Sequence, residues 1–371
     1  MLVRSSDPGV AVAAPASRPL RLWQATLDRL AQQPATALAA GIALPFCATH
    51  CLCCDRDVRC AATGQEVDAY LHDLLAEVAL LRASLGPRHA VSRLHLAGGS
   101  LTELSEVQLL RLFDGLRLLG HVDAGAVISA HVDPRRFSPG LLRLLHGQGV
   151  TRLVLGVLDF DPLVQLAIGR HQPPGLVADA CAQAREAGIE ALQIDLMTGL
   201  PRQTAEGWSR TLEHVLALAP AQVRLREYRH RPRQAPVQVM LEADALPDRG
   251  QCRQLAQQAR QQLHAAGYQP CGADLLLRPD QDADADAVAQ ASWLGCGTGA
   301  VSRVDGRVFF NAAHRPAWHG LVQAGQLPVV QTRRQEWVHP GEWPRRSRCG
   351  DAVRAGRPGA PVGAPGFSPG P

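Results

Sequence analysis

Short apolar stretches alternate with longer amphipathic segments along the middle of this 371-residue chain. Such alternation is typical of parallel β–α units, in which each strand is followed by a helix that packs on the sheet. Six stretches have the length and composition of strands: 41–44, 93–99, 126–132, 152–157, 192–197 and 222–228. The sequence therefore predicts an α/β fold, an open partial (β/α)6 barrel with a C-terminal extension. A closed barrel needs eight units, two more than the chain offers before Pro232.

Helix signals stand between the predicted strands. Apolar residues recur at helical spacing between residues 66 and 85, and Gly86 is placed to end that helix. Ser105, Ser138 and Thr204 can each cap the start of a further helix.

Composition divides the chain into four regions. Residues 1–35 form an N-terminal segment with a Pro- and Ala-rich start, and residues 36–232 carry the predicted strands. Residues 233–330 are expected to form a helical or α+β extension of the core. Residues 331–371 are rich in Arg, Gly and Pro and have too little apolar surface to offset the entropy of ordering, so we expect a disordered tail.

Charge and hydropathy narrow the classes of partner. The formal net charge is only +4, and the absence of Lys makes every fixed positive side chain an Arg. This balance does not favour nucleic-acid binding. No apolar run reaches the 18 residues of a membrane-spanning helix, and no stretch resembles a signal peptide. We therefore expect a cytoplasmic monomer that binds neither nucleic acid nor membranes.

The unusual residues of the chain follow the predicted strands. A cysteine-rich loop, 47–60, follows the first strand, and the segment AGGSLT, 97–102, follows the second. Residues 131–134 end the third strand and residues 195–201 end the fifth. Ligands gather at the carboxyl ends of strands in folds of this kind, so we expect these four segments to share one rim.

The cysteine-rich loop is the strongest chemical signal. Cys47, Cys51 and Cys54 have the spacing C-x3-C-x2-C, and clustered cysteines in a reducing compartment more often bind metal than form disulfides. Three thiolates can hold three corners of a four-iron four-sulfur cluster and leave the fourth iron open. A zinc site is the alternative, because Cys60 and His50 could complete a set of four ligands. The spacing favours iron–sulfur and leaves zinc open.

This spacing, after a first strand and Pro45-Phe46, resembles the radical S-adenosylmethionine superfamily. There the open iron binds the amino and carboxylate groups of S-adenosylmethionine, and reduction of the cluster yields methionine and a 5′-deoxyadenosyl radical. Six further segments, in that family's order up to about Ser302, look like motifs of oxygen-independent coproporphyrinogen III oxidases: LHLAGGSLTEL, ISAHVDPRRF, TRLVLGVLDFDPLVQLAIGRHQ, IDLMTGLPRQTAEGW, YRHRP and GYQPCGADLLLRPD. The resemblance ends after about Gly320, where that family has a further helical domain, so a truncated member is expected.

The resemblance implies roles for the matching residues. The cluster ligands would be Cys47, Cys51 and Cys54. Gly98, Gly99 and Ser100 would let the backbone approach the methionine amino group, since a missing β-carbon permits close contact. Without the cysteines, this segment would be interpreted as an ordinary strand-to-helix turn.

Further positions would contact S-adenosylmethionine. Arg170 would bind a carboxylate through its planar guanidinium, and Asp195 would accept hydrogen bonds from ribose hydroxyls or from a second cofactor molecule. Cys53, Arg229 and Val301 would lie against that second S-adenosylmethionine. Taken alone, Arg170 could be a surface charge and Asp195 a loop cap.

The implied reaction is oxidative decarboxylation of two propionate side chains of coproporphyrinogen III to vinyl groups, which forms protoporphyrinogen IX in haem biosynthesis. The substrate would be a porphyrinogen-type small molecule, and a flavodoxin or ferredoxin would supply electrons. Arg224, Arg226 and Arg229 are candidates to pair with the propionates, although such a row is usually a solvated strand edge. No catalytic residue is assigned. The alternatives are a radical or haem-binding chaperone-like relative with another substrate, and a catalytically decayed paralogue with a binding role.

Several positions depart from the family pattern at cofactor contacts. Gly41 replaces an aromatic residue, His131 replaces a Glu that reaches S-adenosylmethionine, and Leu158 replaces a Gln. An isobutyl group can neither donate nor accept the hydrogen bonds of a carboxamide. The further cysteine that the family carries after the third ligand is absent, because Asp55 and Arg56 follow instead. The sequence therefore predicts a degenerate cofactor site on a preserved scaffold.

Overall fold

The computed structural model describes residues 17–33, 37–86, 89–279 and 292–334. Its main sheet has the strand order β14-β13-β12-β11-β1-β4-β5-β6-β7-β8-β10-β9. Six parallel strands form the centre: β1 (Leu38–Leu44), β4 (Ala90–Gly98), β5 (His121–Val132), β6 (Arg152–Leu158), β7 (Ala191–Thr198) and β8 (Gln222–Glu227). They coincide with the six predicted strands, and the order does not close on itself within the described residues. The α/β fold with an open partial barrel is confirmed.

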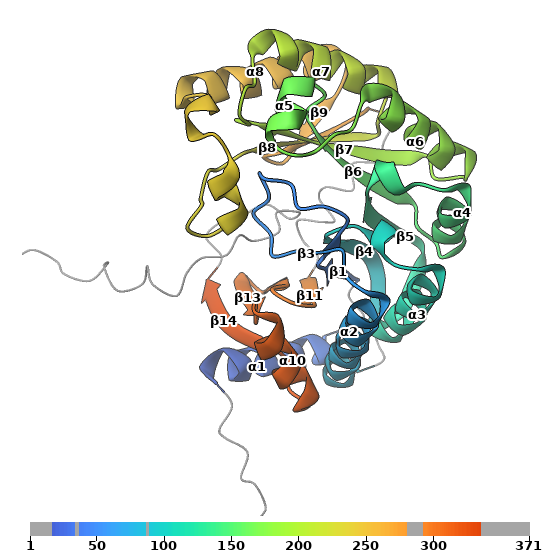
Figure 1. Cartoon of the computed structure of the whole chain (residues 1–371). Helices are drawn as coiled ribbons and strands as arrows, with labels where there is room; N and C mark the ends of the chain where they lie inside the picture. The colour runs from blue at the N-terminus through green and yellow to red at the C-terminus, as the bar shows by residue number, and fades with distance from the viewer. Residues whose placement is uncertain (1–16, 34–36, 87–88, 280–291, 335–371) are drawn as a thin grey trace, which may run out of the picture.

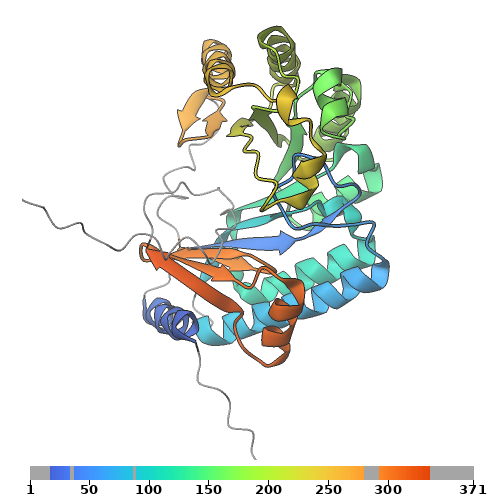
Figure 2. The ribbon, with the colours of Figure 1, turned by 60° about the vertical axis from the view of Figure 1, so that its left-hand side comes forward.

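Parallel strands such as β1, β6 and β7 are buried along most of their length, which is why their sequences are short, continuous apolar runs. All seven residues of β1 are buried, and the consecutive residues Leu153 and Val154 of β6 have no exposed surface. Figure 2 shows the sheet curving around the inside of the molecule with helices on its outer side. One face of each strand therefore packs against the helices, and the other faces the barrel interior.

The outer layer consists of helices that follow the strands along the arc in Figure 1. They are α2 (Gly64–Leu85), α3 (Glu106–Leu116), α4 (Pro139–Gly147), α6 (Pro174–Glu186), α7 (Ala205–Leu218) and α8 (Arg249–Ala265). The hydroxyls of Ser105, Ser138 and Thr204 each accept a backbone N–H from the first turn of their helix, as predicted. Gly86 ends α2 with φ +70°, a conformation that glycine adopts without strain. No helix in the described part of the chain is both long and apolar enough to cross a membrane.

Short elements occupy the loops of the barrel. They are β2 (Phe46–Cys47), β3 (Arg59–Cys60), α5 (Pro162–Ala167), β9 (Gln269–Cys271) and β10 (Leu275–Leu277), with 3-10 turns η1 (Leu101–Glu103), η2 (Arg117–Leu119), η3 (Pro134–Arg136), η4 (Pro236–Met240) and η5 (Ala243–Ala245). β9 and β10 extend the sheet beyond β8 in antiparallel fashion.

The C-terminal part of the described chain extends the sheet on its other side. β11 (Ser292–Cys296) pairs in parallel with β1, and β12 (Val301–Val304), β13 (Arg307–Asn311) and β14 (Val329–Arg334) continue it antiparallel. α10 (Arg315–Gln323) and α1 (Arg18–Gln32) lie near these strands in Figure 1. Residues 331–334, the first four of the predicted tail, belong to β14, and the tail from residue 335 onward lies outside the described residues.

A buried carboxylate joins this extension to the barrel. Glu77 of α2 accepts hydrogen bonds from the Gly297 backbone N–H (2.8 Å), the Trp318 indole N–H (2.8 Å) and the Asn311 amide (2.6 Å). Burial raises the pKa of Glu77 to about 7, although the three donors oppose the shift. One side chain thus connects α2 to three separate segments of the extension.

Candidate functional site

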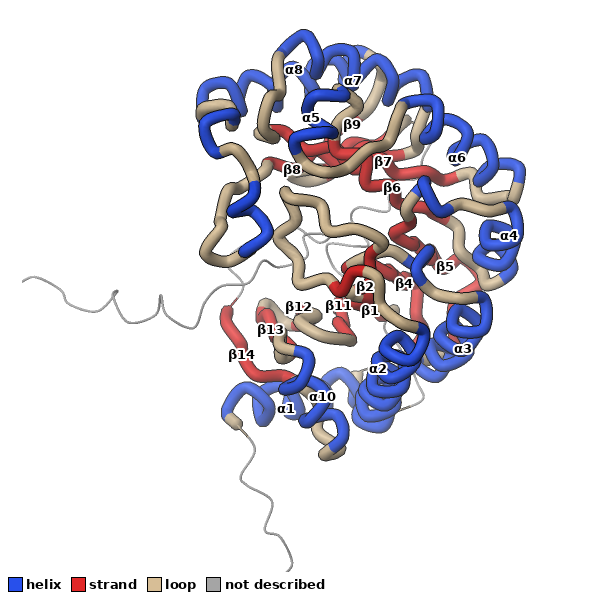
Figure 3. The backbone as a smooth tube through the Cα atoms, in the orientation of Figure 1, coloured by secondary structure: helices blue, strands red, loops and turns tan. Residues whose placement is uncertain are grey.

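The cysteine-rich loop lies across the mouth of the barrel. It leaves β1 through β2, returns through β3, and these two short strands pair in parallel. The Leu52 N–H donates to the Ile168 carbonyl at 2.9 Å, which ties the middle of the loop to the segment after α5. Figure 3 shows the loop as a tan tube between the two sides of the barrel. The predicted convergence of the loop with the strand ends is therefore realised in the fold.

A pocket of about 150 Å³ opens where this loop meets the carboxyl ends of the strands. Most of the residues singled out from the sequence line it, among them Cys47, Cys51, Cys53, Cys54, Gly98, Gly99, Ser100, His131, Leu158, Arg170 and Asp195. They come from the loop and from the ends of β4, β5, β6 and β7, and from the segment after α5. Residues far apart in the sequence are thus brought to one rim, as expected for this fold.

Some of the singled-out residues, Gly41, Arg229 and Val301 among them, do not line the pocket. Arg229 is exposed beyond the end of β8, and Val301 is buried at the start of β12. Gly41 lies within β1, where a β-carbon would come within 2.5 Å of the Trp293 ring. Trp293 of β11 therefore provides an aromatic surface next to β1, although the sequence lacks an aromatic residue at position 41.

Burial and neighbouring thiols destabilise the ionised form of Cys47. Burial first, and then the nearby thiols of Cys54, Cys60 and Cys51, raise the pKa of Cys47 to about 12. Burial is also the main cause of the raised pKa of Cys53. Thiolates at these positions need a compensating positive charge, and an iron–sulfur cluster or a metal ion supplies one. Within the described residues, no group of three or more His, Cys, Asp or Glu side chains is placed to hold a single metal ion.

The two glycines at the end of β4, Gly98 and Gly99, are required by close backbone contact. A β-carbon on Gly99 would lie 1.9 Å from the Phe46 carbonyl oxygen, and Gly98 has φ +114°. The Gly99 N–H donates to the Leu44 carbonyl (2.5 Å), and the Ser100 N–H donates to the Phe46 carbonyl (2.7 Å). This segment therefore fixes the start of the cysteine loop against β4, and no larger residue fits at position 99 without a backbone shift.

Arg170 is held rigidly beside a cysteine. Its Nε donates to the Gly156 carbonyl (2.8 Å) and its Nη1 to the Cys51 sulfur (3.1 Å). The Gln172 amide is best satisfied when its oxygen accepts from Arg170 Nη2 (3.0 Å) and its nitrogen donates to Gly156 (3.2 Å). The sequence did not indicate Gln172, because its role depends on the packing of the segment after α5.

Two carboxylates in the pocket already have donors. Burial alone would raise the pKa of Asp133, but hydrogen bonds from Arg135 and the charge of Arg170 lower it overall. Arg135 Nη2 and Asp133 Oδ2 are 2.6 Å apart. Asp195 is buried and accepts from the Gln193 amide at 2.6 Å.

The remaining departures from the family pattern also face the pocket. Leu158 has φ +72° and places an apolar side chain there. His131 lies edge-on to His95, with ring centroids 5.1 Å apart. Burial and then the guanidinium groups of Arg56, Arg224 and Arg226 lower the pKa of His131 well below its ordinary value. The imidazole is therefore neutral at physiological pH, and the surrounding field is positive.

Arg56 has a place in the site that the sequence did not indicate. It lines the pocket from the cysteine loop, and its Nη1 donates to the Gly98 carbonyl at 3.0 Å. Only the absence of a cysteine at this position was visible in the sequence, because nothing local indicates where the guanidinium points.

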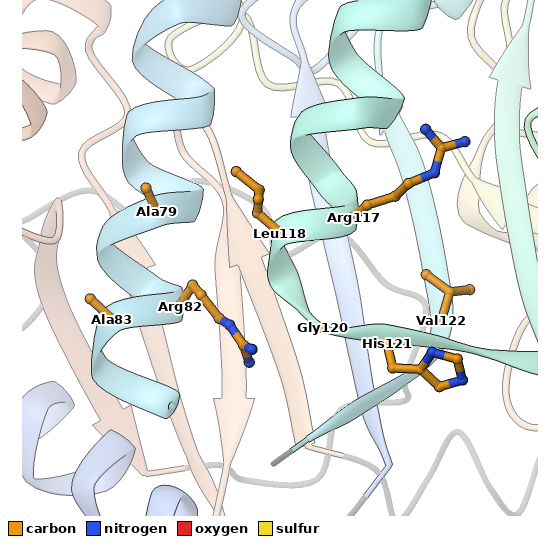
Figure 4. Close-up of a pocket in the computed structure, with 8 residues that line it drawn as sticks. All are labelled: Ala79, Arg82, Ala83, Arg117, Leu118, Gly120, His121 and Val122. Atoms are coloured by element: carbon orange, nitrogen blue, oxygen red, sulfur yellow. The ribbon is translucent and has the colours of Figure 1, made fainter. Parts of the chain in front are cut away.

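A second, larger cavity lies away from the cysteines. Its volume is about 740 Å³, and Figure 4 shows it between α2, the turn at residues 117–119 and the start of β5. This is the amino end of the strands, opposite the cysteine loop. Arg82 donates to the Gly86 carbonyl, and Arg117 donates to Asp114 and Gln148, so both guanidiniums of this cavity are engaged within the chain.

Comparisons with known proteins agree with the geometry. The family model for the radical SAM superfamily matches residues 42–215. An oxygen-independent coproporphyrinogen III oxidase of Paracoccus denitrificans is 34% identical over 270 residues, which are 72% of this chain and 58% of that protein. The Pseudomonas aeruginosa enzyme of the same name is 30% identical over 308 residues, which are 79% of this chain and 67% of that protein. The solved structure of Escherichia coli coproporphyrinogen III oxidase, described as a radical SAM enzyme, has a TM-score of 0.77 at 28% identity and covers 84% of this chain and 75% of that one.

Proposed function

Because the chain belongs to the oxygen-independent coproporphyrinogen III oxidase family of the radical S-adenosylmethionine superfamily, we propose that it decarboxylates coproporphyrinogen III oxidatively. Two propionate side chains would become vinyl groups, which gives protoporphyrinogen IX. Each propionate would lose carbon dioxide, one hydrogen atom to the 5′-deoxyadenosyl radical from S-adenosylmethionine, and one electron to an external electron acceptor. The observation that carries the proposal is the convergence of Cys47, Cys51 and Cys54 on one pocket at the carboxyl rim. The chain spans only 58% of the Paracoccus denitrificans relative, so its activity has to be tested directly.

The residues of the pocket fit the cofactors of this family, a four-iron four-sulfur cluster and S-adenosylmethionine. Cys47, Cys51 and Cys54 would hold the cluster, whose positive iron offsets the mutual repulsion of their thiolates. When bound, the cluster supplies the electron that cleaves S-adenosylmethionine. Arg170 is rigid enough to orient a carboxylate beside Cys51, and Asp195 is placed to accept hydrogen bonds from hydroxyl groups.

Arginines on the inner face of β8 support an acidic substrate. Arg224 and Arg226 alternate with the buried Val223 and Leu225, so both point into the barrel, and Arg226 lines the pocket. Guanidinium groups bind carboxylates in bidentate fashion, which suits propionates. We assign Arg226 to the propionate nearest the cofactor and Arg224 to the deeper part of the barrel. An electron carrier such as a flavodoxin or ferredoxin would reduce the cluster, and the protein would act as a monomer.

The direct test uses the full chain, reconstituted without oxygen with iron and sulfide. The protein is mixed with S-adenosylmethionine, dithionite and coproporphyrinogen III, and 5′-deoxyadenosine and porphyrin products are quantified. We expect 5′-deoxyadenosine and vinyl products in the wild type and neither in Cys51→Ala. A protein that carries the cluster but forms no vinyl product would refute the assigned reaction.

A further inference from the structure

The Arg56 guanidinium lies beside the glycine segment of the cysteine pocket, where the proposed function puts the ammonium group of S-adenosylmethionine. Arg56 Nη1 lies 3.0 Å from the Gly98 carbonyl, in the glycine segment that faces the pocket. In the proposed function, this segment approaches the ammonium group of S-adenosylmethionine. A guanidinium and an ammonium cannot both sit close to one carbonyl oxygen without repelling each other.

Other hydrogen-bond acceptors in the pocket also have donors from the chain. The Gly156 carbonyl accepts from Arg170, and the Asp133 carboxylate accepts from Arg135. Asp195 accepts from Gln193. These acceptors and the Gly98 carbonyl thus already have donors from the chain itself, and three of the four donors are guanidinium groups. A cationic ligand that approaches the Gly98 carbonyl therefore meets the Arg56 guanidinium already bound there.

The small volume of the pocket also suggests that Arg56 occupies space that a ligand needs. Its volume is about 150 Å³, whereas sites for small molecules usually enclose about 300 Å³ or more. Arg56 is half-buried and lines the pocket, so its side chain takes up part of the space at the glycine segment.

We propose that Arg56 is a specificity-determining residue that occupies the ammonium position of the pocket, so that S-adenosylmethionine binds only after Arg56 leaves the Gly98 carbonyl. This inference rests on the proposed function, because it assumes S-adenosylmethionine as the ligand. It assigns to this chain a weaker cofactor site than one with a small residue at position 56.

The test is equilibrium binding to the anaerobically reconstituted protein, with cluster content matched by absorbance. Three probes separate the groups of the ligand: S-adenosylmethionine, S-adenosylhomocysteine, which keeps the ammonium but lacks the sulfonium charge, and methylthioadenosine, which lacks the amino-acid part. The variants are Arg56→Ala and Arg56→Gln. Arg59→Ala is the control, because Arg59 lies in the same loop but is exposed and paired with Glu66.

We expect Arg56→Ala to bind both amino-acid-bearing probes about tenfold more tightly, the size expected for one hydrogen bond to a charged group. Methylthioadenosine should bind as it does to the wild type, and Arg59→Ala should change nothing. Arg56→Gln should give an intermediate gain, since its neutral amide still reaches a carbonyl. It also provides the test if Arg56→Ala does not take up a cluster.

Three results would overturn the inference. The first is unchanged or weaker binding of S-adenosylmethionine to both variants. The second is an equal gain in affinity for all three probes, which would mean that only space was limiting. The third is no binding of S-adenosylmethionine to any form of the protein. The proposed function fails differently, through absence of coproporphyrinogen-dependent cleavage, and that result leaves the binding series intact.

Discussion

Two buried polar clusters of this protein differ in how their charges are satisfied. The Glu77 carboxylate accepts three N–H groups, from Gly297, Asn311 and Trp318, all within the chain. The Cys47 thiol instead has a pKa that is raised by burial and by the neighbouring thiols. The Glu77 carboxylate has its hydrogen-bond donors within the chain, although burial still raises its pKa. The thiolates of the cysteine pocket become stable only with positive charge from outside. We therefore take the cysteine pocket as the functional site and the Glu77 contacts as part of the fold.

The largest expected effect is the loss of the iron–sulfur cluster from the cysteine pocket. Cys51→Ala removes a proposed ligand and should abolish the broad absorption near about 400 nm that iron–sulfur clusters show. Cys60→Ala, in the same loop, should keep that absorption, because Cys60 is not among the three proposed ligands. The reverse pattern, with Cys60 essential and Cys51 dispensable, would contradict the ligand assignment.

Gly99→Ala tests whether the close contact between the backbones of Gly99 and Phe46 is needed for cluster binding. The new β-carbon would lie 1.9 Å from the Phe46 carbonyl, so cluster uptake should fall to about a tenth of wild type or less as the loop shifts. Gly64→Ala is the control, since a β-carbon there meets nothing within 4 Å. Iron content after reconstitution measures both. Normal uptake by Gly99→Ala would show that the loop start tolerates displacement.

Glu77→Ala should remove the hydrogen bonds around the Glu77 carboxylate and therefore destabilise the fold. Three buried N–H groups lose their acceptor, so the free energy of unfolding should fall by about 4 kcal/mol. Urea denaturation of the apoprotein measures this value, with exposed Glu186→Ala as the control. A decrease in unfolding free energy of less than about 1 kcal/mol would mean that water replaces the carboxylate. The hydrogen bonds of Glu77 would then not hold the extension on the barrel.

The smallest effect concerns the pH dependence of the Glu77 cluster. Its folded pKa of about 7 exceeds the ordinary 4.5, so the folded state binds more protons than the unfolded state between these values. The contribution of Glu77 to stability is therefore fully present below pH 4.5 and declines until about pH 7, by up to about 3 kcal/mol. The difference in unfolding free energy between wild type and Glu77→Gln should follow this decline from pH 5 to 8. A constant or rising difference would show that the three donors lower the pKa of Glu77 more than burial raises it.

Local patterns were sufficient to predict the barrel. Strands such as β6 are continuous apolar runs because both faces are buried, and helix starts carry capping residues such as Ser105. The gathering of the cysteine loop, Gly98–Ser100 and Asp195 at one rim followed from the rule that carboxyl ends of parallel strands share an edge.

Contacts between distant segments were not predictable in this way. The pairing of β11 with β1 brings the Trp293 ring against Gly41, so an aromatic side chain from a distant strand fills the space beside position 41. Glu77 and Arg56 look like ordinary surface charges in the sequence. Their roles depend on which backbone groups the fold places beside them, and no local pattern records this.

We propose that three thiolates of the loop hold a cubic cluster whose fourth iron is open. Mössbauer spectroscopy of protein reconstituted with ⁵⁷Fe distinguishes that iron from the other three. We expect about four irons per chain, one of which changes its isomer shift when S-adenosylmethionine is added while the other three do not. Four irons that all stay unchanged, or a tightly bound zinc ion in place of any cluster, would contradict it.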